Sequence, residues 1–171
     1  MSIFDDVISE VLMANKNLVT LRPVVEKEIL HHDILRVMNK HELLKDLTFK
    51  GGTSLRLCHN SDRLSEDLDF TGGFNFNRDA LYNLKEVLIG EIKEKYNLDI
   101  QVAEPVKETG NVDTWKVKIQ TRTERKFLPA QRIHLDICSI SSHDIQIKTL
   151  NNHYRFNFGT SNLAIKVQSM E

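Results

Sequence analysis

The sequence has few of the features that mark membrane, secreted or zinc-binding proteins. No apolar run approaches the roughly 18–20 residues that a membrane-spanning helix needs. The N-terminus carries early acids and lacks the basic segment of a secretory signal. Cys58 and Cys138 are the two cysteines, and neither has a neighbour at zinc-finger spacing. Two reduced thiols suit a cytoplasmic protein, although the sequence also allows a disulfide. We expect a cytoplasmic protein without a membrane contact.

A general excess of positive charge is also absent. The chain has 23 Lys and Arg against 24 Asp and Glu, a formal net charge of -1. Any contact with nucleic acid must therefore use a local basic patch. The candidate is a connection between two predicted strands, which is otherwise an ordinary solvated loop. It contains Arg122, Arg125, Lys126 and Arg132. The P-loop and Rossmann glycine motifs are missing as well.

The hydrophobic pattern predicts a single domain of mixed α/β (α+β) class. Apolar residues repeat at helical spacing within residues 1–45, and most charged side chains lie outside that stripe. The histidine pair at 31–32 is placed where the surface meets the core. Residues 46–150 are predicted to form the core, a mixed, mostly antiparallel sheet flanked by helices. A last helix is expected to begin within residues 160–171.

A glycine pair separates a short apolar strand-like segment from a helix-compatible run. Gly51 and Gly52 follow Lys50, and the run continues through Thr53 and Ser54. The N–H groups at a helix start and the helix dipole favour anions such as phosphate. A glycine pair alone is more often a simple turn.

Two aspartates follow in a second strand-like run. Side chains at i and i+2 of a strand share a face, so Asp67 and Asp69 are expected to point the same way, while Leu68 and Phe70 enter the core. An isolated pair of this kind is usually a solvated strand face. Two carboxylates on a half-buried face, however, repel each other and need a cation. Asp136, which alternates with apolar residues on a later strand, is the best candidate for a third carboxylate. Three such groups could hold two Mg²⁺ or Mn²⁺ ions.

These motifs resemble those of the AbiEii/AbiGii toxin family of nucleotidyltransferases from type IV toxin–antitoxin systems. Asp136 matches the family's third aspartate, and residues 163–166 resemble the start of a helix that carries a lysine. The family's downstream aspartate and C-terminal helices do not occur in the 171 residues, so we expect a chain that lacks the family's C-terminal part. The resemblance to the family is strongest in two segments of this chain, Lys50-Gly51-Gly52-Thr53-Ser54-Leu55 and Arg63-Leu64-Ser65-Glu66-Asp67-Leu68-Asp69-Phe70.

The resemblance implies a polymerase beta-like core and an enzyme that transfers a nucleotide from an NTP to an acceptor such as tRNA, releasing pyrophosphate. Growth arrest or phage defence by abortive infection would result, with a separately encoded antitoxin as partner. Asp67 and Asp69 would bind the metal, and Asp136 would complete the metal site and act as base. The implied nucleotide-binding residues are Lys50, Gly51, Gly52, Thr53, Ser54, Arg63 and Lys166.

Two other interpretations stay open. The chain could be a catalytically inactive nucleotide-binding or interaction module, because the family's C-terminal part is missing. It could also be an enzyme that modifies a small molecule, since the same site would serve and only the acceptor would differ.

Overall fold

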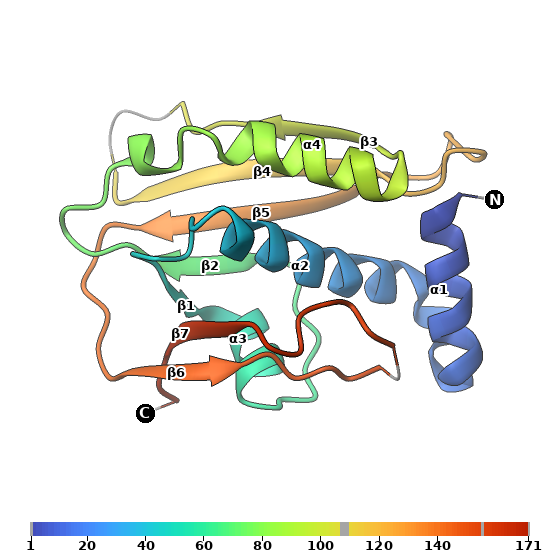
Figure 1. The fold of residues 1–171 in the computed structure, drawn as a ribbon, viewed down its shortest axis with the longest axis horizontal. Helices are drawn as coiled ribbons and strands as arrows, with labels where there is room; N and C mark the ends of the chain where they lie inside the picture. The colour runs from blue at the N-terminus through green and yellow to red at the C-terminus, as the bar shows by residue number, and fades with distance from the viewer. Residues whose placement is uncertain (1, 107–109, 155, 171) are drawn as a thin grey trace.

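The structure is a computed structural model that describes residues 2–106, 110–154 and 156–170. Within these residues, one sheet of seven strands has the order β3-β4-β5-β2-β1-β7-β6 (Figure 1). The strands are β1 Thr48–Lys50, β2 Leu68–Thr71, β3 Asp99–Ala103, β4 Val112–Gln120, β5 Gln131–Cys138, β6 Ile145–Thr149 and β7 Ala164–Gln168. The helices are α1 Ile3–Ala14, α2 Arg22–Lys40, α3 Gly51–Cys58 and α4 Leu84–Tyr96, with 3₁₀ turns at η1 Lys16–Leu21 and η2 Arg78–Leu81.

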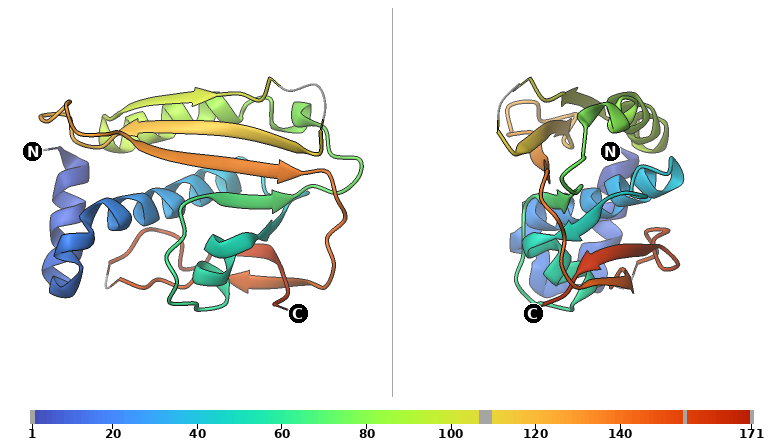
Figure 2. Two further views of the ribbon diagram at one scale, coloured as in Figure 1. Left: turned by 180° about the vertical axis from the view of Figure 1, so that it is seen from behind. Right: turned by 90° about the vertical axis from the view of Figure 1, so that its left-hand side faces the viewer.

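Helices α2 and α4 cover one face of the sheet, and α1 packs at one end of α2 (Figure 1). Seen from behind, β4, β5 and β2 present their other face, which is turned away from these two helices (Figure 2). We call this second side the open face. The alternation of apolar and polar residues separates the two sides, because Leu68, Phe70 and Leu135 are buried toward the helices while Asp69 and Asp136 remain half-exposed.

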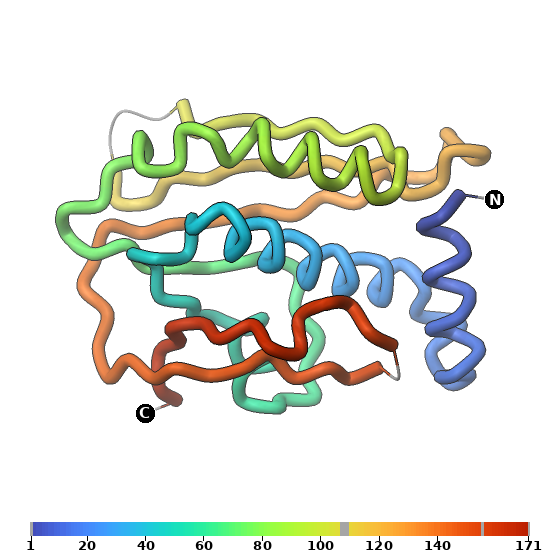
Figure 3. The backbone as a smooth tube through the Cα atoms, in the orientation of Figure 1, coloured from blue at the N-terminus to red at the C-terminus, as the bar shows by residue number. Residues whose placement is uncertain are grey.

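Strand β2 lies between β1 and β5 and brings distant parts of the chain together. It runs antiparallel to β1 and parallel to β5, and the trace in Figure 3 shows β5 returning alongside β2 after the long β3–β4 excursion. Antiparallel pairs predominate, with β1–β7 as the second parallel pair. The predicted fold class, a mixed sheet flanked by helices, is confirmed.

The helix predicted within residues 160–171 is wrong, since Ala164–Gln168 forms strand β7. Ile165 and Val167 are buried, while Lys166 between them is only partly covered. This period of two is a strand pattern, and β-branched Ile and Val favour strands. Hydrogen bonding to β1 on one side and β6 on the other outweighs the weak helical signal of so short a segment.

Helix α2 differs from the prediction, which placed most charged residues outside one apolar stripe and the histidine pair at the edge of the core. Its polar residues Glu26, Glu28, His31, His32 and Asp33 are all buried. Segments from several parts of the chain surround the helix and supply hydrogen-bond partners, so polar side chains are enclosed on nearly every side. None of the helices in the described ranges combines the length and apolar character needed to cross a bilayer.

The aromatic pair at the centre of the sheet gives a test of the core. Phe49 and Phe70 stack with ring centroids 5.1 Å apart, and both are fully buried. Phe70→Ala is expected to lower the free energy of unfolding by about 3–5 kcal/mol, because it removes apolar contacts and leaves a cavity. Phe74→Ala is the matched control, since Phe74 is 76% exposed, and a surface change of this kind alters stability by about 0.5 kcal/mol or less. Urea denaturation of both variants measures the difference.

Candidate active site

One row of side chains crosses four strands on the open face. Lys50 of β1 pairs in register with Asp69 of β2, and Asp69 pairs with Asp136 of β5. Asp136 in turn faces Thr114 of β4, whose Oγ1 donates a hydrogen bond to Asp136 Oδ1 at 2.5 Å. Two predicted carboxylates, separated by 66 intervening residues, therefore lie on neighbouring strands.

Asp67 lies just before β2 and is held by its surroundings. Its Oδ1 accepts a hydrogen bond from the backbone N–H of His134 at 3.0 Å. Its backbone carbonyl accepts another from Oγ1 of Thr53. The Asp67 charge also contributes to the pKa of Asp69. The structure thus brings the three predicted carboxylates into one neighbourhood, with Asp67 anchored from β5 and α3.

The three carboxylates repel one another. Burial raises the pKa of Asp69 above its ordinary value of 3.8, and the negative charges of Asp136 and Asp67 raise it further, while Lys50 opposes them. An acidic cluster of this kind favours a proton or a cation between the carboxylates.

The donor set suits Mg²⁺ or Mn²⁺, because carboxylate oxygens are the ligands these hard cations prefer. The raised pKa of Asp69 supports the fit: burial is its largest cause, and a divalent ion would relieve the further rise that comes from the charges of Asp136 and Asp67. Within the described residues, no three Asp, Glu, His or Cys side chains are already arranged around a common metal position.

The glycine pair places the start of α3 directly against the acidic cluster. Gly51 has φ +78°, and a Cβ there would lie 2.6 Å from Asp69 Oδ2. A Cβ on Gly52 would lie 2.8 Å from Ser65 Oγ. Helix α3 begins without a side-chain cap, so its first N–H groups are suited to an anion. Because Ser54 Oγ donates back to the Gly51 carbonyl at 2.8 Å, the groups of this turn that could receive an anion are mainly backbone N–H groups.

The comparison with protein families matches residues 33–171 to the nucleotidyl transferase AbiEii toxin of type IV toxin–antitoxin systems. The chain belongs to the AbiEii family. The matched residues include the glycine turn, all three aspartates and β7.

Two solved structures from Helicobacter pylori show weaker similarity. The protein JHP933 is 20% identical, with a TM-score of 0.47 over 84% of this chain and 53% of that one. A candidate nucleotidyltransferase is also 20% identical, with a TM-score of 0.45 over 84% of this chain and 55% of that one. The present chain thus spans about half the length of each. No curated protein matches the sequence.

The basic residues predicted to bind the nucleotide lie at different distances from the acidic cluster of this AbiEii chain. Lys50 lies in the acidic row and donates from Nζ to Cys138 Sγ at 2.8 Å. Arg63 is exposed in the connection before β2. Lys166 lies on β7, two strands from Asp69, and lines a separate cavity of about 370 Å³ beside Lys45. The structure brings Lys50 to the acidic cluster but places Lys166 apart from it.

The predicted basic patch divides into two parts. Arg122 forms an ion pair with the buried Glu26 at 3.3 Å, so its charge is used within the fold. Arg125 and Lys126 are exposed in the β4–β5 connection, and Arg132 is exposed on β5. Since Arg132 is four residues before Asp136 on one strand, it shares the open face with the carboxylates.

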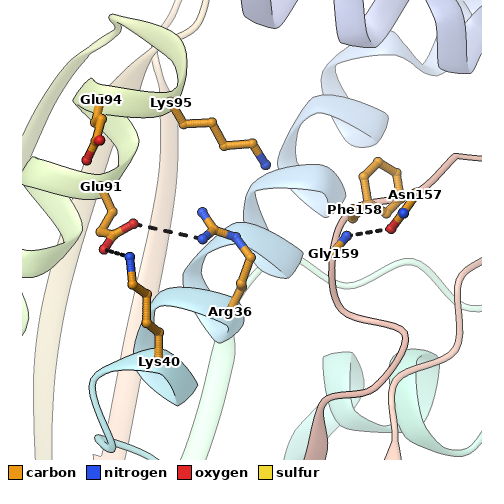
Figure 4. Close-up of a pocket in the computed structure, with 8 residues that line it drawn as sticks. All are labelled: Arg36, Lys40, Glu91, Glu94, Lys95, Asn157, Phe158 and Gly159. Atoms are coloured by element: carbon orange, nitrogen blue, oxygen red, sulfur yellow. Dashed lines mark hydrogen bonds and ion pairs between the residues drawn. The ribbon is translucent and has the colours of Figure 1, made fainter.

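A separate cavity of about 500 Å³ lies between α2, α4 and residues 157–159 (Figure 4). Its charges largely neutralise one another, since Glu91 contacts Lys40 at 2.6 Å and Arg36 at 3.9 Å. None of the three carboxylates lines this cavity. The acidic row, rather than this hollow, is the candidate active site.

Several residues of the site were not identified from the sequence. Thr114, Ser65 and Cys138 contact or adjoin predicted site residues, and His31 contacts the segment before Asp67. The alternation in β4 and β5 was a usable signal for Thr114 and Cys138, because it places both on the polar face. For His31 and Ser65 there was no local signal, since their partners are distant in sequence or set by a loop.

A substitution at Gly51 tests how closely the start of α3 packs against Asp69. Gly51→Ala is expected to destabilise the protein by at least about 1–2 kcal/mol, because an L side chain is unfavourable at positive φ and this Cβ would collide with Asp69. Gly90→Ala is the matched control, since Gly90 lies in α4 with open space around it. That change is expected to stabilise the helix by about 0.5–1 kcal/mol. Equal effects in urea denaturation would contradict the proposed packing.

The raised pKa of Asp69 predicts a pH-dependent cost to stability. The carboxyl group binds its proton more tightly in the folded protein than in the unfolded chain, so its stabilising contribution is lost as the pH rises through the folded pKa. Asp69→Asn cannot ionise and should raise the melting temperature at neutral pH. This gain should shrink as the pH falls through the folded pKa of Asp69 toward the ordinary value of 3.8, below which the carboxyl group is protonated in both states. Thermal unfolding across this range measures it, and a gain independent of pH would contradict the argument.

Proposed function

We propose that this AbiEii-family protein is a metal-dependent nucleotidyltransferase toxin that transfers a nucleotide from an NTP to an acceptor and releases pyrophosphate. The observation that carries the proposal is the in-register pair Asp69 and Asp136 lying directly beside the uncapped start of α3. A cation site and an anion site in contact are what a metal-bound triphosphate requires.

The glycine turn would hold the triphosphate. The N–H groups of Gly51, Gly52 and Thr53 begin α3 and favour phosphate oxygens. Lys50 would add a positive charge from the end of β1, where its Nζ now contacts Cys138 Sγ. Ser54, Arg63 and Lys166 stay predicted nucleotide-binding residues, and Arg63 and Lys166 would have to approach the nucleotide from outside the acidic row.

Asp67 and Asp69 would hold Mg²⁺ or Mn²⁺ together with Asp136. The chemistry such an ion supplies when bound is charge stabilisation on the phosphate oxygens and a lower pKa for the acceptor hydroxyl. Asp136 has Oδ1 engaged by Thr114, which would leave Oδ2 to accept the acceptor's proton. The acceptor oxygen would then bond to the α-phosphorus, the bond from that phosphorus to the bridging oxygen would break, and pyrophosphate would leave.

The open face next to the carboxylates suits a polyanionic acceptor such as tRNA. Lys118 and Arg132 lie directly opposite each other on β4 and β5, and Lys116 lies one step nearer the site. All three are exposed. Like charges facing each other across strands are destabilising, and a phosphate backbone would relieve that repulsion. The exposed Arg125 and Lys126 lie in the loop at the end of the same two strands and would extend the strip.

The partner would be the antitoxin protein of the same type IV system. Membership of a toxin–antitoxin family supports this partner. Growth arrest, including arrest that limits phage infection, would follow from nucleotide transfer to an essential acceptor when the antitoxin is absent.

Incubation with each α-labelled NTP, Mg²⁺ and total RNA, total protein or a small-molecule extract tests the proposal. The wild type is expected to label RNA. Asp69→Asn and Asp136→Asn are expected to lower transfer by roughly 100- to 10,000-fold, as loss of a base or charge-stabilising group does. Asp99→Asn, on the exposed edge strand β3, is the matched control and should transfer at the wild-type rate.

The acceptor fractions separate the alternatives. Label in the small-molecule extract alone would replace tRNA with a small acceptor. Binding of an NTP by calorimetry without any labelled product over hours would indicate an inactive module. Undiminished transfer by both aspartate variants would overturn the assignment of the acidic row as the active site.

A further inference from the structure

Helix α2 reaches the acidic strand through one buried histidine. His31 Nε2 lies 2.8 Å from the backbone carbonyl oxygen of Glu66, the residue before Asp67. The His31 side chain is fully buried. A carbonyl oxygen can only accept a hydrogen bond, so Nε2 must carry the ring proton. This contact fixes the peptide that leads directly into Asp67.

His31 holds the backbone of the segment before β2 and not a side chain. The Glu66 side chain is 80% exposed and takes no part in the contact with His31. Asp67 itself is anchored on two other sides, by the His134 N–H at its carboxylate and by Thr53 at its carbonyl. The hydrogen bond from His31 supplies a third fixed point, from the helix layer behind the sheet.

The histidine has no other partner that would explain its polarity. Within the described part of the chain, its Nδ1 has no hydrogen-bond partner. Burying a polar nitrogen without a partner costs free energy, and burial also lowers the pKa of His31 to about 4, which keeps the ring neutral at neutral pH. An apolar ring would fill the same space without this cost. The bond to Glu66 is therefore the contact that the imidazole specifically provides.

The next residue makes an instructive contrast. His32 is also buried, and its Nδ1 contacts Thr160 Oγ1 at 2.9 Å while its ring packs on Phe158. That contact ties α2 to the segment before β7 and does not involve the acidic strand. Both histidines precede residues 33–171, which match the AbiEii family, so that match assigns neither of them a role.

We propose that His31 is a positioning residue, whose Nε2–H fixes the Glu66–Asp67 peptide and so holds the Asp67 carboxylate beside Asp69. This inference rests on the proposed function for its catalytic consequence. The positioning of Asp67 by His31 does not depend on whether the protein catalyses nucleotide transfer.

The first test uses the metal-free protein and needs no activity. The amide N–H of His134, which donates to Asp67 Oδ1, reports the position of the carboxylate in NMR spectra. His31→Phe is expected to shift this resonance and speed its hydrogen exchange, because Asp67 is no longer held. His31→Gln retains an N–H donor near the Nε2 position and should restore the resonance. His32→Phe is the matched control and should leave it unchanged.

The second test measures nucleotide transfer by the same variants. His31→Phe should lower kcat on the order of 10- to 100-fold, the loss expected when a reacting group is misplaced, with a smaller change in KM for the NTP. His31→Gln should recover most of the rate, and His32→Phe should retain it. A wild type without transfer would refute the proposed function, whereas the His134 amide would still decide whether His31 positions Asp67.

An unchanged His134 resonance in a folded His31→Phe variant would overturn the proposal. If that variant does not fold, the ring nitrogens of the wild type decide the question. ¹⁵N NMR should show that Nε2 of His31 is protonated and that Nδ1 is not. The opposite tautomer would remove the donor to Glu66 and refute the proposal.

Discussion

The buried polar side chains of α2 are the constraint on which the rest of the structure depends. Glu26 accepts from Thr121 and Gln131 and binds the β4–β5 connection. Glu28 pairs with Arg56 of α3 and with the Tyr154 hydroxyl. Further along the helix, His31 holds the segment before β2, His32 holds Thr160, and Asp33 accepts from Lys95 and Tyr96 of α4. One helix thus binds parts of the chain that are far apart in sequence, and each bond satisfies a group that would be costly to bury alone.

This scaffold supports an open face that is electrostatically unfavourable by itself. Asp69 is packed against Gly51, and its burial together with the charges of Asp136 and Asp67 raises its pKa, while Lys50 opposes that shift. Lys118 faces Arg132 across β4 and β5, so two positive charges lie opposite each other. Both features cost stability in the free protein, and both would be relieved by ligands, the first by a divalent cation and the second by a polyanion.

Two local sequence patterns predicted where the candidate site residues lie: the alternation of residues along a strand and the glycine pair before a helix. The alternation around Asp69 and Asp136 correctly placed both on the polar face, and the glycine pair correctly marked the start of α3. Residues 160–171 were misassigned because five residues carry too little periodicity to separate helix from strand, and pairing with β1 and β6 decided the outcome. The burial of the charged residues of α2 was not predicted, since a helical pattern shows which side is apolar and not what covers the other sides.

The sequence by itself determined the fold class, because periodicity and turn residues act over a few residues, and the resemblance of its glycine and aspartate motifs indicated the family. Only the tertiary structure decided that Asp69 and Asp136 pair in register, that Thr114 orients Asp136 and that His31 reaches Glu66. These contacts join residues that are tens of positions apart. Their geometry depends on strand order and on the packing of α2, which no local pattern encodes.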